Sequence, residues 1–305
     1  MRNRYWRCGL WVVAWSLLGA SAEAGGAWVP EPGRGFLYLG ASRKTADSSW
    51  NAFGDAFTHL NASGQRVWHD FRYVYLSGEI GVAPRLALTF TGTWLDGREG
   101  TRPGYEQNKG LSEAFVGAKY QFRRGAWPMA LAFNHRTPVF YDLPGAYNRH
   151  LFDSSGQFRG VSPEWRGLLK RDYSLSLHVS RSVARHRGWT SVEAGHTWRE
   201  GAPANQLFAA ADVGYPLPWL RSHVKLAGAG QWTVGDFTTP QPDDRFRGRA
   251  DYNFNEAGYA KLGASWLVPL GAGTDWVVEV GYARWVWGRS ARRYGEPYLS
   301  LGRSF

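Results

Sequence analysis

The sequence predicts an all-β fold, a transmembrane antiparallel β-barrel of about twelve strands with periplasmic termini. Three observations lead to this prediction. The chain begins with an export signal, it contains about a dozen strand-like segments, and it ends on Phe305 at the close of an alternating segment. Alternation suits a barrel wall, because one face of each strand meets lipid and the other meets the lumen.

Residues 1–24 have the pattern of a signal peptide. Three arginines precede the apolar stretch 10–18, and Ala22, Glu23 and Ala24 form a small-x-small cleavage site. Cleavage is expected after Ala24, which leaves residues 25–305 as a single barrel domain. The apolar stretch is shorter than the roughly 20 residues that a membrane-spanning helix needs.

The charge balance of the mature chain favours lipid over nucleic acid as a partner. Cleavage removes three of 36 basic residues and one of 25 acidic residues, so the formal charge falls from +11 to +9. An exported chain does not meet DNA, and anionic lipid headgroups are the expected partner. Cys8 lies in the signal peptide, so the mature chain is expected to have no disulfide and no thiolate chemistry.

The strand assignment depends on a period of two. In the segment 170–181, Tyr173, Leu175 and Leu177 alternate with serines and a histidine, a pattern that no helix would show. The twelve expected strands are 34–43, 66–79, 85–95, 111–122, 128–138, 170–181, 188–199, 206–215, 222–234, 252–267, 275–287 and 297–305. An even number of strands returns both termini to the same side.

The connections between these strands alternate in length. Short turns are expected near 80–85, 123–128, 184–188, 216–222 and 269–274. Longer connections are expected near 44–65, 96–110, 139–169, 235–251 and 288–296, and one outer connection, 201–205, is short. Short periplasmic turns and long outer loops are typical of outer-membrane barrels.

Tryptophans lie near both ends of the expected strands, as in the aromatic belts of membrane proteins. One belt would hold Trp127, Trp189, Trp219, Trp266 and Trp276. The other would hold Trp94, Trp198, Trp232 and Trp287. The alternative is a soluble β-sandwich or lectin with an aromatic-rich binding face, but a lectin would not need strands this long and numerous.

Three stretches carry a distinctive strand-turn-strand pattern. They are Glu79–Phe90, Gly110–Phe122, and Trp127–Phe133 followed by Arg136, Thr137 and Pro138. They resemble the outer-membrane protein family named for meta-pathway phenol degradation. The resemblance implies a barrel associated with uptake of aromatic or other apolar compounds. Where family members tend to have Gly-Leu-Gly-Asp, this chain has Gly110, Leu111, Ser112 and Glu113.

The last residue, Phe305, resembles the signal by which the barrel assembly machinery recognises outer-membrane barrels. The resemblance therefore implies that this machinery is a partner of the chain during assembly.

Charged residues on the polar faces of the strands are the candidates for lining the lumen. They are Asp70, Arg72, Glu113, Lys119, Arg136, Glu193, Asp212, Lys225, Lys261 and Glu279. Acids and bases balance, and a buried charge must pair, hydrogen-bond or face water. The set therefore either forms a network that fills the lumen or lines a narrow aqueous path without strong ion selectivity.

The connection 139–169 is long and aromatic, which suits a loop that folds over a pore. Its gating candidates are Phe140, Tyr141, Tyr147, Phe152, Phe158 and Trp165. They would either receive a hydrophobic solute or pack the outer loops together.

Basic residues in other outer connections would contact lipopolysaccharide phosphates or form a solvated rim. They are Arg245, Arg247, Arg249, Arg289, Arg292 and Arg293.

The sequence carries no signature of catalysis. There is no Gly-x-Ser-x-Gly turn, and the histidines show no metal-binding spacing. We therefore expect no enzymatic activity, no catalytic residue, no cofactor and no metal.

The expected function is passive diffusion of a small hydrophobic or aromatic solute through a loop-gated, monomeric outer-membrane channel. The alternative is a structural or docking barrel with a charge-plugged lumen that serves an export or assembly partner.

Overall fold

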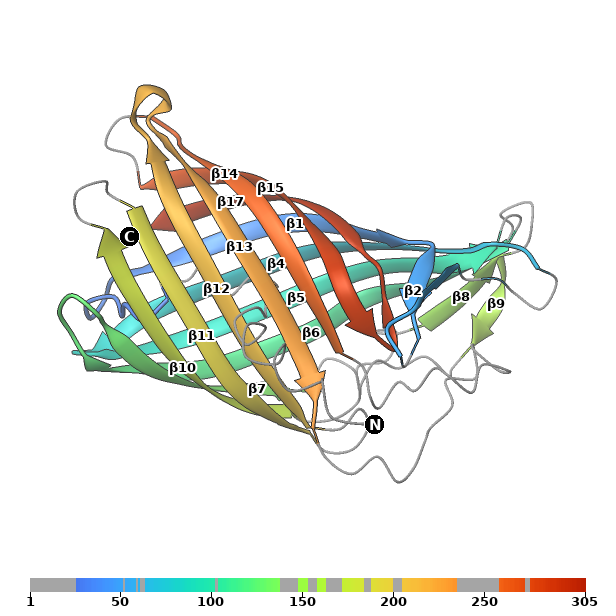
Figure 1. Cartoon of the computed structure of the whole chain (residues 1–305), viewed down its shortest axis with the longest axis horizontal. Coiled ribbons are helices and arrows are strands. Elements are labelled where there is room, and N and C mark those ends of the chain that lie inside the picture. The colour runs from blue at the N-terminus through green and yellow to red at the C-terminus, as the bar shows by residue number, and fades with distance from the viewer. Residues whose placement is uncertain are drawn as a thin grey trace, which may run out of the picture.

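Twelve strands close into an antiparallel barrel (Figure 1), which confirms the predicted all-β barrel of about twelve strands. The computed structural model describes residues 26–51, 53–58, 60, 64–101, 104–137, 148–152, 158–162, 172–183, 188–199, 205–234, 258–271 and 275–305. The barrel strands are β1 (Gly35–Ala46), β4 (Val67–Ala83), β5 (Leu86–Thr101), β6 (Gly104–Arg123), β7 (Met129–Thr137), β10 (Asp172–Val183), β11 (Gly188–Arg199), β12 (Gln206–Leu217), β13 (Ser222–Thr233), β14 (Gly258–Pro269), β15 (Trp276–Arg289) and β17 (Gly295–Ser304).

The first and last strands close the ring. Phe36 pairs with Ser304, and the backbone amides of Gly35 and Phe305 each donate a hydrogen bond of 3.0 Å to the other's carbonyl. Both ends of the barrel-forming chain therefore lie at the same end of the barrel, which we call the terminal end. We call the opposite end the loop end.

Short elements decorate the loop end. Strands β2 (Ser48–Trp50), β3 (Ala56–Thr58) and β16 (Ala291–Arg292) form a separate three-stranded sheet. Strands β8 (Asn148–Phe152) and β9 (Phe158–Ser162) extend the main sheet beside β6 (Figure 1). A single turn of 3-10 helix, η1 (Pro218–Leu220), connects β12 to β13 at the terminal end.

Each predicted strand is present, but the predicted long connection 96–110 is wrong. Strand β5 continues to Thr101 and β6 begins at Gly104. These two residues are partners, and the strands remain paired from there to Leu86 and Tyr120. Alternation persists here with its polarity reversed, because Asp96 and Arg98 face outward while Leu95 is buried. The polar residues of 96–110 therefore suggested a loop, although the sheet continues through this segment.

Apolar side chains lie on the outer face of the barrel and charged side chains lie in its interior, the reverse of the arrangement in a soluble protein. Leu39, Val116 and Val280 are about half exposed on the outer face, whereas Glu79 and Glu279 are among the largest fully buried side chains. Contiguous exposed apolar surface of this kind marks contact with another apolar phase. Among the described residues, no helix is long and apolar enough to span a membrane.

Aromatic rings cover glycines on neighbouring strands. The ring of Tyr75 lies over Gly40, and the ring of Tyr298 lies over Gly281. A Cβ atom at either glycine would overlap the ring. These glycines therefore let large side chains lie flat against the inner wall.

We predict that Gly40→Val lowers the free energy of unfolding by about 1–3 kcal/mol, the usual range for overpacking. Urea titration of the refolded protein in micelles measures the change. Gly92→Val is the matched control, because no atom lies within 4 Å of the position that a Cβ would take at Gly92. Equal losses in the two variants would contradict the steric explanation.

Candidate functional site

The barrel interior is the candidate site, and most of the predicted lumen-lining residues face it. Their side chains take part in interior ion pairs or hydrogen bonds, are largely buried, or do both. They are Lys119, Arg136, Glu193, Asp212, Lys225, Lys261 and Glu279. The side chain of the eighth candidate, Glu113, lies outside the described part of the structure.

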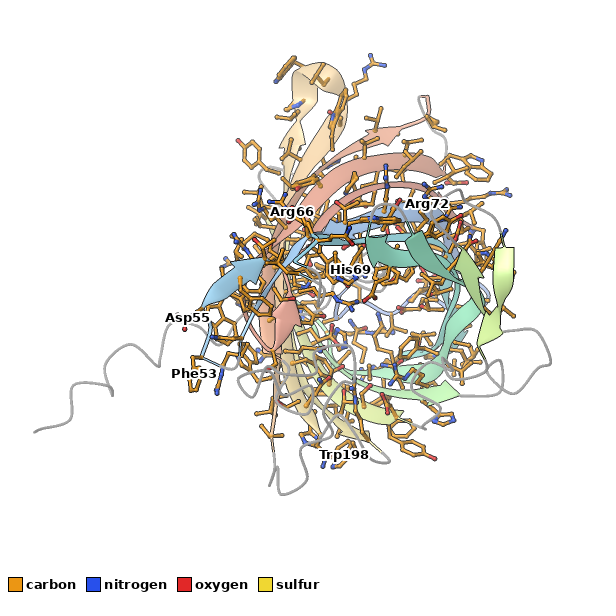
Figure 2. The ribbon with its side chains drawn as sticks, turned by 90° about the vertical axis from the view of Figure 1, so that its right-hand side faces the viewer. Phe53, Asp55, Arg66, His69, Arg72 and Trp198 are labelled. Atoms are coloured by element: carbon orange, nitrogen blue, oxygen red, sulfur yellow. The ribbon has the colours of Figure 1, made fainter. Side chains whose placement is uncertain are left out.

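Asp70 and Arg72 correct the prediction, because they lie on the outer face of β4. They share that face with Val74 and Leu76, which are 49% and 47% exposed, whereas His69, Ser77 and Glu79 face inward. Figure 2 shows His69 inside the ring of strands and Arg72 on its outer side. Polar residues mark the interior only beside the outward apolar band, and Asp70 and Arg72 lie beyond that band.

Near the terminal end, ion pairs join strands that are not neighbours. Lys225 Nζ of β13 lies 2.7 Å from Glu279 Oε1 of β15, and Lys119 Nζ of β6 lies 2.6 Å from Glu79 Oε2 of β4. Ser265 and Tyr298 also donate hydrogen bonds to Glu279. Each charge is thus compensated from across one intervening strand.

A serine, a histidine and a glutamate meet on β10 and β11, but their geometry does not match a catalytic triad. His178 Nε2 lies 3.0 Å from Ser176 Oγ and 3.4 Å from Glu193 Oε1. A triad uses one imidazole nitrogen for the nucleophile and the other for the carboxylate. Here the same nitrogen faces both groups, so the arrangement is a polar cluster.

Three further charge clusters lie near the loop end, and the sequence prediction missed most of their members. Glu296 lies between Lys44 and Lys261, at 3.6 and 3.7 Å. Asp172 pairs with Arg136 and Arg199, and Glu99 pairs with His69 and Arg292. Period-two phasing from neighbouring apolar residues would have identified those on the long strands. Arg292 corrects the expectation of a lipopolysaccharide contact or solvated rim, because its largely buried side chain pairs with Glu99.

Aromatic rings line the same region of the interior. Tyr294 packs edge-on against Phe71 and Trp285, with ring centroids 6.2 and 5.3 Å apart, and Tyr259 lies 5.7 Å from Trp285. Trp285 also packs against Trp50 of the short sheet. The loop end of the interior is therefore both aromatic and charged.

The segment before β1 occupies the interior near the terminal end, which the sequence did not predict. Lys119 and Gln121 donate hydrogen bonds to the carbonyls of Gly26 and Ala27, at 3.0 and 2.9 Å. The amide of Ala27 donates to Ser180 Oγ at 2.8 Å, and Ala27 is fully buried. The segment thus contacts β6 and β10, which lie three and five strands from β1 in the ring.

Two glycines permit this close approach. Gly26 has a φ of +52°, and a Cβ there would overlap the hydroxyls of Ser180 and Ser191. At Gly81 of β4, a Cβ would overlap the carbonyls of Pro30 and Glu31. Pairing of Pro32 with Gly81 then leads the chain into β1.

The aromatic candidates for gating fall largely outside the described structure. Phe140, Tyr141, Tyr147 and Trp165 are not described, and Phe152 and Phe158 are described only as backbone in β8 and β9. Of the expected belt residues, Trp189 is a correction. It faces inward, where its indole donates a 2.6 Å hydrogen bond to Asp212.

The other belt residues are compatible with their predicted positions. At the terminal end, Trp127, Trp219, Trp266 and Trp276 are exposed. At the loop end, Trp94, Trp198 and Trp287 are exposed, and Figure 2 shows Trp198 at the outer edge of the ring. Among the described residues, no group of three His, Cys, Asp or Glu could hold a metal ion.

We predict that Lys225→Met destabilises the barrel by about 3–5 kcal/mol, because it leaves the buried carboxylate of Glu279 without its cation. The double variant Lys225→Met/Glu279→Gln should recover most of this loss. Unfolding titrations of both single variants and the double variant complete the cycle. Additive losses would show that the two side chains do not interact.

Comparisons with solved structures place the barrel among known folds. No family model and no curated protein matches the sequence. The structure is similar to the COG4313 outer membrane channel from Pseudomonas putida F1, with a TM-score of 0.59 and 11% identity, covering 92% of this chain and 98% of that chain.

Two autotransporter domains are also similar. The transport unit of AIDA-I from Escherichia coli has a TM-score of 0.51 and 10% identity, over 95% of this chain and 93% of that chain. The translocator domain of NalP from Neisseria meningitidis has a TM-score of 0.50 and 10% identity, over 89% and 88%. A channel and two autotransporter domains thus share this barrel fold.

Proposed function

We propose that this chain is a monomeric channel of the bacterial outer membrane that passes a small solute by passive diffusion. The observation that carries the proposal is the polarity of the barrel, with apolar residues outside and paired charges inside. Such a wall suits hydrocarbon on one side and an aqueous path on the other. The similar Pseudomonas structure, described as an outer membrane channel, supports the proposal.

The proposed orientation puts the terminal end in the periplasm. Short connections lie at that end, as expected for periplasmic turns. Cleavage after Ala24 would then make Gly26, which lies inside the barrel, the second residue of the mature chain. Assembly through Phe305, whose backbone pairs with Gly35 at the closure of the ring, is part of the same proposal.

The proposed solute is apolar or aromatic. The aromatic cluster of Phe71, Tyr259, Trp285 and Tyr294 at the loop end supports this choice, because rings favour contact with other rings. Entry would be gated by the connection 139–169, through the aromatic candidates that the sequence suggested. The charged residues that face inward would line the path beyond this entrance.

A second function, docking or export with a plugged lumen, is favoured by a different observation. Interior charges are paired across strands, and the segment from Gly26 occupies the terminal end. The two autotransporter neighbours share the barrel fold. In this alternative, the filled interior stiffens a barrel that presents its loops to a partner.

We predict that Gly26→Val increases single-channel conductance in planar bilayers. The substitution combines a disfavoured positive φ with a clash against Ser180 and Ser191. It should therefore displace the segment before β1 from the interior. Gly33→Val is the control, because Gly33 has a φ of +80° but a Cβ added there would have no atom within 4 Å. Unchanged conductance in Gly26→Val would show that the segment does not restrict the path.

Shortening the connection 139–169 to a Gly-Ser turn tests the proposed gate. We predict larger or longer openings and faster uptake of an aromatic solute into proteoliposomes. If the wild-type protein, the shortened form and Gly26→Val are each verified as folded and show neither conductance nor solute uptake, the docking function would be favoured.

A further inference from the structure

We propose that the outer face of β1, β4, β5 and β6, beyond the apolar band, binds the phosphates of lipopolysaccharide. This face, which we call the arginine ladder, consists of Arg43, Asp70, Arg72, Asp96, Arg98, Gln107 and Lys109. The proposal depends on the outer-membrane location and orientation proposed above. The ladder is distinct from the arginines in outer connections that the sequence suggested.

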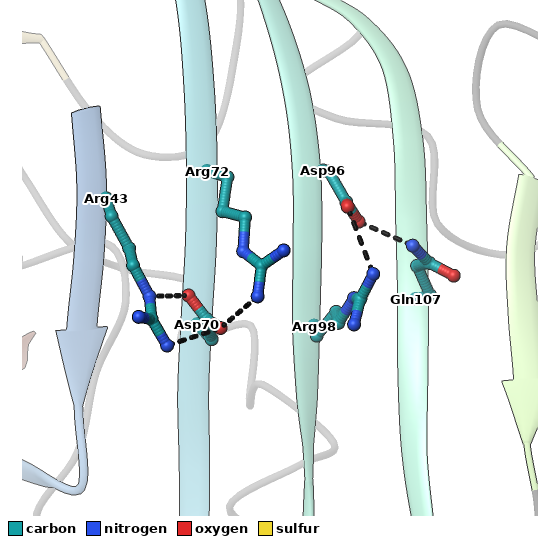
Figure 3. Close-up of polar contacts among 6 residues, drawn as sticks. All are labelled: Arg43, Asp70, Arg72, Asp96, Arg98 and Gln107. Atoms are coloured by element: carbon teal, nitrogen blue, oxygen red, sulfur yellow. Dashed lines mark hydrogen bonds and ion pairs between the residues drawn. The ribbon is translucent and has the colours of Figure 1, made fainter. Parts of the chain in front are cut away.

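The ladder is an ordered array of ion pairs and hydrogen bonds within and between neighbouring strands (Figure 3). Arg43 donates from Nε and Nη2 to the two carboxylate oxygens of Asp70, at 2.8 and 3.0 Å. Arg72 donates to Asp70 at 3.3 Å, and Arg98 donates to Asp96 at 3.3 Å. The aspartates therefore hold three guanidinium groups in fixed positions on one surface.

The register puts this array directly beyond the apolar band. Val74 pairs with Trp94, and the next outward pair along the strands is Arg72 with Asp96. Trp94 is 43% exposed, and an exposed indole prefers the headgroup level of a membrane. One further outward position along a strand is a rise of about 7 Å, which brings Arg72 to the level of headgroup phosphates.

The array has more positive charge than its aspartates neutralise. Within the ladder, Arg43, Arg72, Arg98 and Lys109 carry four positive charges, whereas Asp70 and Asp96 carry two negative charges. The side chains of Arg43 and Arg72 are 55% and 49% exposed. An excess of exposed positive charge suits a phosphorylated headgroup, because guanidinium groups bind phosphate through paired charge-assisted hydrogen bonds.

The guanidinium groups also keep donors for a ligand. Within the described structure, Arg72 and Arg98 each use one terminal nitrogen for a carboxylate, and Nη1 of Arg43 has no acceptor. Four adjacent strands at a spacing of about 4.8 Å make the ladder about 14 Å wide. This width allows contact with more than one phosphate of a bisphosphorylated sugar headgroup.

Holding the arginines in place lowers the entropy lost when a ligand binds. The opposing explanation is that the ladder only fastens β1 to β4, through Arg43 and Asp70, and β5 to β6, through Asp96 and Gln107. Two sets of substitutions separate these explanations, because both break the same ion pairs but change the charge in opposite directions.

The test measures binding of bisphosphorylated lipid A to the refolded mature protein in detergent by native mass spectrometry. Arg43→Gln/Arg72→Gln/Arg98→Gln should weaken binding at least tenfold. Asp70→Asn/Asp96→Asn should strengthen it several-fold, because two competing carboxylates are removed. Arg303→Gln is the control, since this outward arginine lies at the terminal end over Trp276 and should leave the affinity unchanged.

Dephosphorylated lipid A and phosphatidylglycerol identify the source of the recognised phosphate. Dephosphorylated lipid A should bind weakly to all variants, and phosphatidylglycerol should not compete with lipid A. Equal affinities in the two sets of variants, changes in the same direction, or competition by phosphatidylglycerol would overturn the proposal. Conductance in phospholipid bilayers without lipid A, measured on the same samples, tests the channel function separately.

Discussion

The pairing of β1 with β17 is the interaction on which the rest of the structure depends. It turns an open sheet into a ring, so that no barrel strand is left with an unpaired edge. In hydrocarbon, an exposed sheet edge would leave backbone amides and carbonyls without partners at a cost of several kcal/mol each. Closure also encloses the interior, and contacts such as that of Ser42 with Glu296 form because the ring returns to its own first strand.

Strand pairing and closure together bring into contact residues that are far apart in the sequence. Ser42 of β1 donates a hydrogen bond to Glu296 of β17, and Lys225 meets Glu279 across one strand. None of these pairs is local, so their geometry depends on the register of several strands at once. A shift of one residue in any strand would turn its interior charges outward.

The sequence was sufficient for the strands because alternation is a local signal. In β10, the alternation of Leu175 and Leu177 with Ser176 and His178 could be phased without knowledge of any neighbour. The same logic placed most of the charged candidates in the interior. It failed at Asp70 and Arg72, where the apolar band ends and polar residues no longer indicate which face is inside.

Other features could not be predicted because they depend on contacts between distant segments. The segment from Gly26 has no periodicity, and its position depends on Lys119, Gln121 and Ser180 in other strands. The extension of β5 after residue 95 and of β6 before residue 111 likewise depends on the pairing of these two strands. A single sequence shows the composition of such segments but not their partners.

The cross-strand pairing of interior charges also constrains how this barrel can diverge. Outward apolar positions such as Val116 and Val280 can exchange one aliphatic residue for another independently. A change at Glu79 or Lys225 leaves a buried opposite charge behind, so it is tolerated only with a second change on another strand. Relatives of this chain should therefore differ singly on the outer wall and in correlated sets inside, and those sets would record which strands face one another.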